Sequence, residues 1–117
     1  MKFALFTHVP WPEGEQPAVL DDIIERVVEV AAPEKIIFFG SVARGEFGRN
    51  SDIDLLVVKD GEDTLSLSAR IYGAMQGVGV AVDVLVVSSA DVERYKDSHS
   101  LIIKPTLQEG VVVYGSV

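Results

Sequence analysis

The stretch that decides the fold is KIIFFGSVARGEFGRNSDIDLLVVK, residues 35–59. It opens with a short apolar run over 35–39 and closes with a second apolar run over 52–59. Short runs of this kind, rich in β-branched and aromatic residues and bounded by Gly, Ser and Asn, predict buried strands. Between them, Ser41 is a suitable N-cap for a short helix over 42–44, followed by a loop. The stretch therefore predicts strand, helical turn, loop and strand in close succession.

Outside this stretch, helical and strand patterns continue to alternate. Expected helices cover 18–32, 64–76 and the segment from Ser88 or Ser89 to Tyr95, and expected strands cover 3–9, 80–87 and 111–114. The first helix carries apolar residues at helical spacing on one side and acidic residues on the other. In the second, four residues are expected to face partly inward: Leu65, Leu67, Ile71 and Met75. Segment 101–109 looks helical at both ends, but Pro105 should kink it or start a new turn.

This alternation predicts an α/β (α+β) fold, in which helices pack on a mixed β-sheet whose strand order stays open. A length of 117 residues fits one domain. We expect residues 1–17 to be an N-terminal extension, with an extra strand and a Pro-rich linker, and residues 18–117 to form the domain.

Composition excludes several classes of function. The chain has no cysteine, which rules out disulfides, thiolate zinc sites and cysteine nucleophiles. Its 10 basic and 18 acidic residues give 10 − 18 = −8, so direct nucleic-acid binding and attraction to anionic membranes are not expected. No apolar run approaches the roughly 18 residues of a membrane span. We therefore expect a cytoplasmic protein that has no membrane partner.

Three aspartates carry the candidate chemistry. Asp52 and Asp54 lie two apart on an expected strand, so their side chains share one face, with Cα atoms about 6.6 Å apart. Asp83 interrupts an otherwise apolar strand and joins them if the two strands are neighbours. Such carboxylates repel one another unless a cation is shared, and an oxygen-only ligand set suits Mg²⁺, with Mn²⁺ as the alternative. By itself Asp83 could instead be a buried aspartate that backbone donors satisfy.

Gly40 and Ser41 stand where the first strand of this stretch ends and the helical turn begins. A glycine lets a ligand approach the backbone closely, and a helix start offers free N–H groups to a phosphate. Arg44 can contact the same phosphate, or can form an ion pair that holds the following loop. A phosphate cradle beside a metal-binding carboxylate pair is the arrangement that phosphoryl or nucleotidyl transfer requires.

The sequence resembles the DNA polymerase beta superfamily of nucleotidyltransferases, and most of all the minimal nucleotidyltransferases, the MNT antitoxins that pair with HEPN toxins. The resemblance rests on Gly40-Ser41, ten intervening residues and Asp52-Ile53-Asp54, on Val82-Asp83-Val84, and on the ending QEGVVVYG over 108–115. It covers about residues 18–115, and four separated elements occur in the right order.

The resemblance implies ATP as substrate and two metal ions. Gly40 and Ser41 would hold the triphosphate, Asp52 and Asp54 would bind metal, and Asp83 would be the third ligand and would help to deprotonate the attacking hydroxyl. The acceptor would be a tyrosine of a HEPN-type toxin, which would be silenced by AMP. The alternatives are an antitoxin that blocks its partner by contact alone, and a transferase that acts on a small molecule. A partner, with homodimer contacts as a further element, would complete the open acceptor side.

Overall fold

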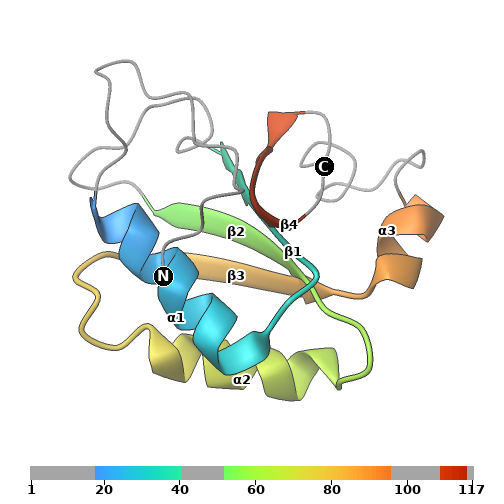
Figure 1. Ribbon diagram of the computed structural model, residues 1–117, viewed down its shortest axis with the longest axis horizontal. Coiled ribbons are helices and arrows are strands. Elements are labelled where there is room, and N and C mark those ends of the chain that lie inside the picture. The colour runs from blue at the N-terminus through green and yellow to red at the C-terminus, as the bar shows by residue number, and fades with distance from the viewer. Residues whose placement is uncertain (1–17, 41–51, 96–108, 116–117) are drawn as a thin grey trace.

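In the part of the chain that the structure describes, four strands form one mixed sheet, and two helices cover one of its faces (Figure 1). The computed structural model describes residues 18–40, 52–95 and 109–115. Its helices are α1 (Ala18–Ala31), α2 (Thr64–Ala74) and α3 (Ser89–Tyr95), and its strands are β1 (Lys35–Phe39), β2 (Ile53–Val58), β3 (Val82–Val87) and β4 (Val111–Gly115). The expected fold class, helices packed on a mixed sheet, is confirmed.

The strand order, which the sequence left open, is β3-β2-β1-β4. β1 pairs antiparallel with both β2 and β4, whereas β2 and β3 run parallel. A parallel pair needs a crossover between its strands, and α2 supplies it. Among the described strands, the two from the 35–59 stretch therefore lie at the centre of the sheet, with β3 and β4 at its edges.

The helix-covered face holds the main core. α1 buries five residues of its apolar stripe: Leu20, Ile23, Ile24, Val27 and Ala31. They pack against strand residues of alternating position, among them Phe38, Ile53 and Leu55, each of which has no exposed surface. Because side chains alternate along a strand, burying these residues sends their neighbours to the opposite face of the sheet.

Helix α2 corrects one expectation. It buries Leu67 and Ile71, and Met75 at its C-cap, at the four-residue spacing of a helix face. Leu65 does not face inward and is 80% exposed. Two positions separate it from Leu67, which is about 200° around a helix of 3.6 residues per turn, so it must point away when Leu67 points in.

The opposite face carries a smaller apolar cluster, formed by Ile37, Leu56, Val58 and Val87. Val92 of α3 packs against it. The expected cap of α3 is confirmed at Ser88, whose N–H donates to Asp91 Oδ2 (3.2 Å) and whose Oγ accepts from the Asp91 N–H (3.1 Å). This reciprocal pair holds α3 where β3 ends.

Several expectations fall outside the described residues: the strand over 3–9, the helical turn over 42–44 and the kink at Pro105. The division into an extension over 1–17 and a domain over 18–117 stays a prediction. Among the described helices, none is long and apolar enough to cross a membrane.

Candidate functional site

Asp54 and Asp83 are brought together by the pairing of β2 with β3. They are register partners in this parallel pair. In such a pair, partners send their side chains to the same face. Ile53 and Leu55 are buried against the helices, so Asp54 projects from the other face, and Asp83 projects there with it. Two strands far apart in the sequence thus present adjacent carboxylates.

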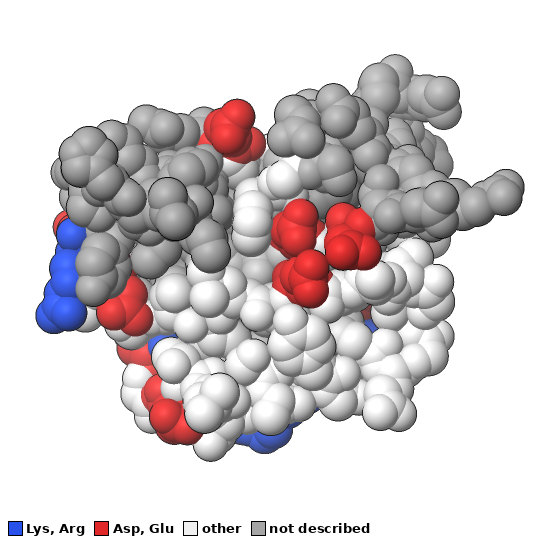
Figure 2. Space-filling model, turned by 180° about the vertical axis from the view of Figure 1, so that it is seen from behind, with Lys and Arg blue, Asp and Glu red and all other residues white. Residues whose placement is uncertain are grey.

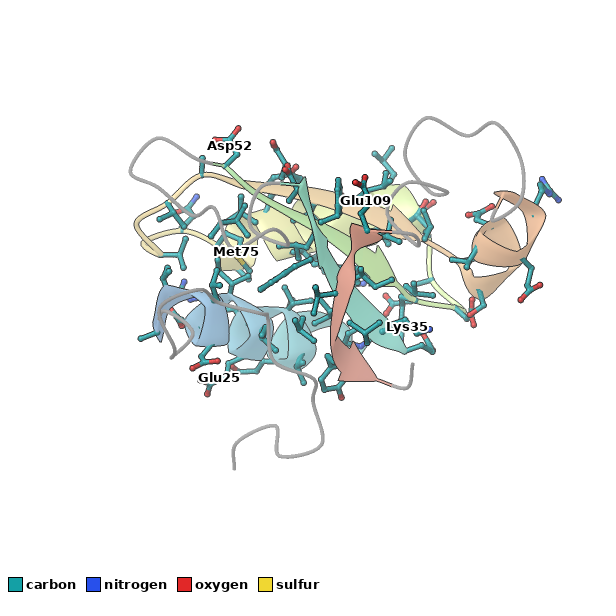
Figure 3. All side chains as sticks on the ribbon, turned by 90° about the horizontal axis from the view of Figure 1, so that it is seen from above. Glu25, Lys35, Asp52, Met75 and Glu109 are labelled. Atoms are coloured by element: carbon teal, nitrogen blue, oxygen red, sulfur yellow. The ribbon has the colours of Figure 1, made fainter. Side chains whose placement is uncertain are left out.

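Asp52 lies two residues before Asp54, immediately ahead of β2. Figure 3 shows it at the end of the strand, on the side of the sheet away from α1. Figure 2 views this face and shows acidic side chains gathered on it, with mostly uncharged described atoms around them. The convergence of Asp52, Asp54 and Asp83 on one face is therefore present.

Gly40 makes room for one of these carboxylates. It follows β1, whose last residue, Phe39, is the register partner of Asp54. Its φ is +69°, a conformation that L side chains rarely adopt, and a Cβ built on it would overlap Asp54 Oδ2. The sequence predicted that this glycine lets a ligand approach the backbone, and in the structure the close neighbour is the Asp54 side chain.

The electrostatics of Asp54 reflect this crowding. Its pKa is raised from the ordinary value of 3.8, first by burial and then by the negative charges of Asp83 and Asp52. The neighbours that act on its charge are thus two further carboxylates, whose repulsion a bound cation would offset.

The donor atoms of the three aspartates suit a metal ion, but the side chains are not close enough together to enclose one. The donors are all carboxylate oxygens, the ligands that Mg²⁺ and Mn²⁺ prefer. Within the described ranges, however, no three acidic or histidine side chains stand close enough together to enclose an ion. Asp54 and Asp83 project from the same face of the sheet, and Asp52 acts on the charge of Asp54, so these three carboxylates would be the ligands of a shared cation.

Ser41 and Arg44, the other two predicted nucleotide contacts, lie outside the described residues. The phosphate cradle therefore stays a prediction. The structure places its first residue, Gly40, at the carboxylates.

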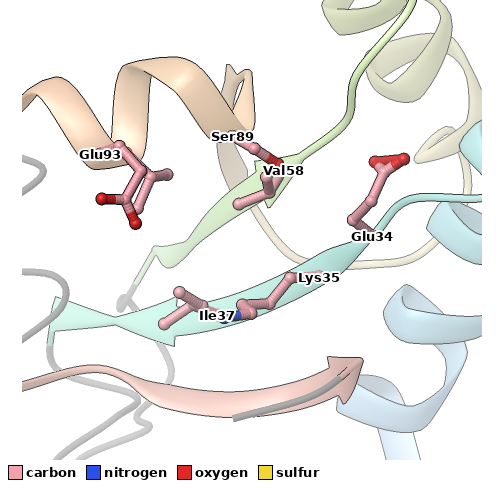
Figure 4. Close-up of a pocket in the computed structure, with 7 residues that line it drawn as sticks. Glu34, Lys35, Ile37, Val58, Ser89 and Glu93 are labelled. Atoms are coloured by element: carbon pink, nitrogen blue, oxygen red, sulfur yellow. The ribbon is translucent and has the colours of Figure 1, made fainter.

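A pocket of about 260 Å³ opens near the other end of β2 and contains none of the predicted site residues. It is lined by Glu34, Lys35, Ile37, Val58, Ser89, Val92 and Glu93. Figure 4 shows Glu34 and Glu93 at opposite ends of it. Glu34 accepts from the Asp60 N–H (3.0 Å), and the N–H and Oγ of Ser89 both donate to Asp60 (2.7 Å each).

These bonds account for part of the polar lining of the pocket. Those from Ser89 lower the pKa of Asp60, the backbone bond most. Val58 is four residues from Asp54, about 13 Å along a strand, so the pocket is separate from the carboxylates.

Sequence reasoning missed one residue beside the site, Tyr72 of α2. It is 44% exposed, and its hydroxyl accepts a hydrogen bond from the Val84 N–H (2.9 Å). No sequence signal identifies this contact, because it depends on where α2 lies against β3.

A first prediction follows from the raised pKa of Asp54. Between the unfolded and the folded pKa, the folded state binds more protons than the unfolded state, so this group lowers stability as pH rises through that range. Asp54→Asn removes the charge at nearly constant shape. At pH 7 without metal we expect it to raise the free energy of unfolding by about 0.5–1 kcal/mol, a modest gain because water screens a site that is partly open.

Urea denaturation at pH 5 and pH 7 in chelator measures this effect. Glu29→Gln, which neutralises an exposed carboxylate on α1, is the matched control and should change stability little. Equal stability of Asp54→Asn and the native protein at pH 7 would contradict the repulsion inferred at the site.

The described residues define a class of mixed-sheet protein in which a parallel β2–β3 pair presents facing aspartates, beside a left-handed glycine at the end of β1. Comparison with known families identifies that class. The nucleotidyltransferase domain family matches residues 20–114, and the chain belongs to this family.

Two solved structures share the fold. One is a proposed nucleotidyltransferase from Sulfolobus solfataricus, with 21% identity, a TM-score of 0.51 and coverage of 85% of this chain and 88% of that one. The other is a toxin–antitoxin structure with AMP-PNP, with 21% identity, a TM-score of 0.53 and coverage of 81% and 73%. At this identity the likeness concerns the fold. No curated protein matched the chain.

Proposed function

We propose that this nucleotidyltransferase is the antitoxin of a toxin–antitoxin pair and transfers AMP from ATP to a hydroxyl, a tyrosine hydroxyl in particular, of a HEPN-type toxin. The observation that carries the proposal is the register of Asp54 with Asp83, with Asp52 two residues before Asp54 on the same face. The family match supports nucleotidyl transfer, and the fold shared with a toxin–antitoxin structure that holds AMP-PNP supports the choice of nucleotide and partner.

In this proposal Asp52, Asp54 and Asp83 hold Mg²⁺, or Mn²⁺ in its place. The cation supplies charge neutralisation to the phosphates when it is bound. Gly40 and Ser41 bind the triphosphate, and Arg44 adds a contact to it. Most of the catalytic effect in such reactions comes from positioning and electrostatic stabilisation, which three carboxylates on one rigid sheet face suit well.

The proposed step forms one bond to phosphorus and breaks another. The tyrosine oxygen forms a bond to the α-phosphorus of ATP, the bond from that phosphorus to the bridging oxygen of the β-phosphate breaks, and pyrophosphate leaves. Asp83 accepts the hydroxyl proton. A free tyrosine has a pKa near 10, so at neutral pH it needs such a base to react.

The test is incubation of the protein with α-labelled ATP, Mg²⁺ and the HEPN-type toxin that the proposal pairs with it. We expect label on a toxin tyrosine and loss of toxicity, both abolished by chelator. An unlabelled toxin that is still neutralised by an Asp52/Asp54 double alanine variant would contradict catalysis and favour blocking by contact. Label on an added small-molecule acceptor and not on the toxin would favour the other alternative.

A further inference from the structure

We infer that Tyr72 is a positioning residue whose hydroxyl fastens the outer edge of β3 next to Asp83 and so holds that carboxylate opposite Asp54. The inference rests on the proposed function, in that it gives Tyr72 a part in forming the metal site. It adds a residue from α2 to a site otherwise built from strands and the turn after β1.

The contact lies on an edge strand. Among the described strands, β3 has only one neighbour, β2. The carbonyls of Ala81 and Val87 accept from Ile53 and Lys59, so alternate residues from 81 to 87 face β2. The intervening residues, 82, 84 and 86, turn their backbone groups to the outer edge. The Tyr72 hydroxyl meets the Val84 N–H there, at 2.9 Å.

Core packing does not explain this side chain. α2 packs into the core through Leu67, Ile71 and Met75, and Tyr72 is not among the residues of that core. It remains 44% exposed, and its hydroxyl reaches the backbone one residue after Asp83. The hydroxyl thus supplies a partner to a strand amide that would otherwise face solvent.

The hydrogen bond between Tyr72 and Val84 affects the direction of the Asp83 side chain because it lies one residue away. Asp83 is exposed, so few side-chain contacts restrain it, and its direction follows from the backbone of β3. Edge strands have backbone bonds on one side only and twist more readily than central strands. A fixed point at Val84 restricts the twist of the backbone that carries Asp83, and the Asp54–Asp83 pairing is kept for a cation to use.

The test compares Tyr72→Phe with the native protein in two measurements. Hydrogen exchange of the Val84 amide reports the bond itself and should become at least about 10-fold faster, as expected when a bond of about 1.4 kcal/mol is lost from a locally opening edge. Mn²⁺ binding by calorimetry, without nucleotide, reports the positioning and should weaken about 3- to 10-fold. Removal of a group that holds a metal ligand in place commonly costs about 10- to 100-fold in metal affinity, and we expect a loss at or below the lower end of that range because this bond acts through the backbone.

Asp63→Ala is the matched control. It removes the cap of the same helix, where Asp63 Oδ2 accepts from the Ser66 N–H (3.0 Å), and should lower the stability of the protein. If α2 only stabilises the fold, both variants should leave Mn²⁺ affinity unchanged. We expect affinity to fall in Tyr72→Phe and to hold in Asp63→Ala.

The outcomes separate the two proposals. Unchanged Mn²⁺ affinity in Tyr72→Phe, or unchanged exchange at Val84, overturns the positioning role while the proposed function stands. A native protein that binds Mn²⁺ no better than its Asp54→Ala variant contradicts the metal site itself, and the positioning role fails with it.

Discussion

Asp54→Ala is expected to slow nucleotidyl transfer by a factor of about 10² or more, the cost of removing one preorganised electrostatic group from an active site. Asp54 is the central carboxylate of the three. It pairs in register with Asp83, feels the charge of Asp52 and lies against Gly40. In the proposed mechanism, its loss removes a ligand that both neighbours need in order to share a cation.

The measurement is the initial rate of AMP transfer at saturating ATP and Mg²⁺. Glu29→Ala is the control, because it deletes an exposed carboxylate on α1 and changes the net charge equally. If the Asp54→Ala rate stays within a factor of about two of the native rate, the loss is far smaller than expected for such a group. That result would count against the mechanism. The same variant should show no loss of folding, since a carboxylate with a raised pKa does not stabilise the folded state at neutral pH.

Gly40→Ala is expected to lower both stability and activity. The φ of +69° costs an alanine roughly 1–2 kcal/mol, and the added methyl overlaps the Asp54 carboxylate. The carboxylate must move, and a misplacement near 1 Å in a positioned group can cost about 10²-fold in rate. We therefore expect a destabilisation of about 1–3 kcal/mol, together with a loss of transfer that approaches that of Asp54→Ala.

Gly77→Ala separates the two effects. Gly77 has a φ of +83°, so it carries the same backbone strain, but nothing lies within 4 Å of a Cβ built there. It should lose similar stability and keep its transfer rate. If Gly40→Ala keeps full activity as well, the glycine is needed for the turn and not for the placement of Asp54.

Local patterns predicted much of the fold. The alternation of apolar and acidic residues in α1 and the apolar run of β1 fix those elements through spacing alone, and their bounds agree with the structure to within one residue. The prediction that Leu65 faces inward was wrong. Several apolar residues in one weakly amphipathic helix compete for the inward face, and packing against the sheet decides among them. The fold class was confirmed, and so was the family.

The candidate site shows a similar division. The two-residue spacing of Asp52 and Asp54 puts them on one face of any strand, so the sequence could pair them. Whether Asp83 joins them depends on which strand lies beside β2 and in which register, because a slip of one residue would send Asp83 to the helix-covered face. The sequence could not predict the role of Tyr72 for the same reason, because its hydrogen bond joins a helix to an edge strand.

Side-chain spacing and backbone preference along the chain are enough to show which residues can form helices, strands and turns. They also show which carboxylates are available. Three contacts come from tertiary packing alone. Asp83 lies opposite Asp54, Gly40 leaves space for the Asp54 carboxylate, and the Tyr72 hydroxyl bonds to the edge of β3. Each of these is a contact between segments distant in sequence. Such contacts are set by how the whole apolar core packs, which no local stretch encodes.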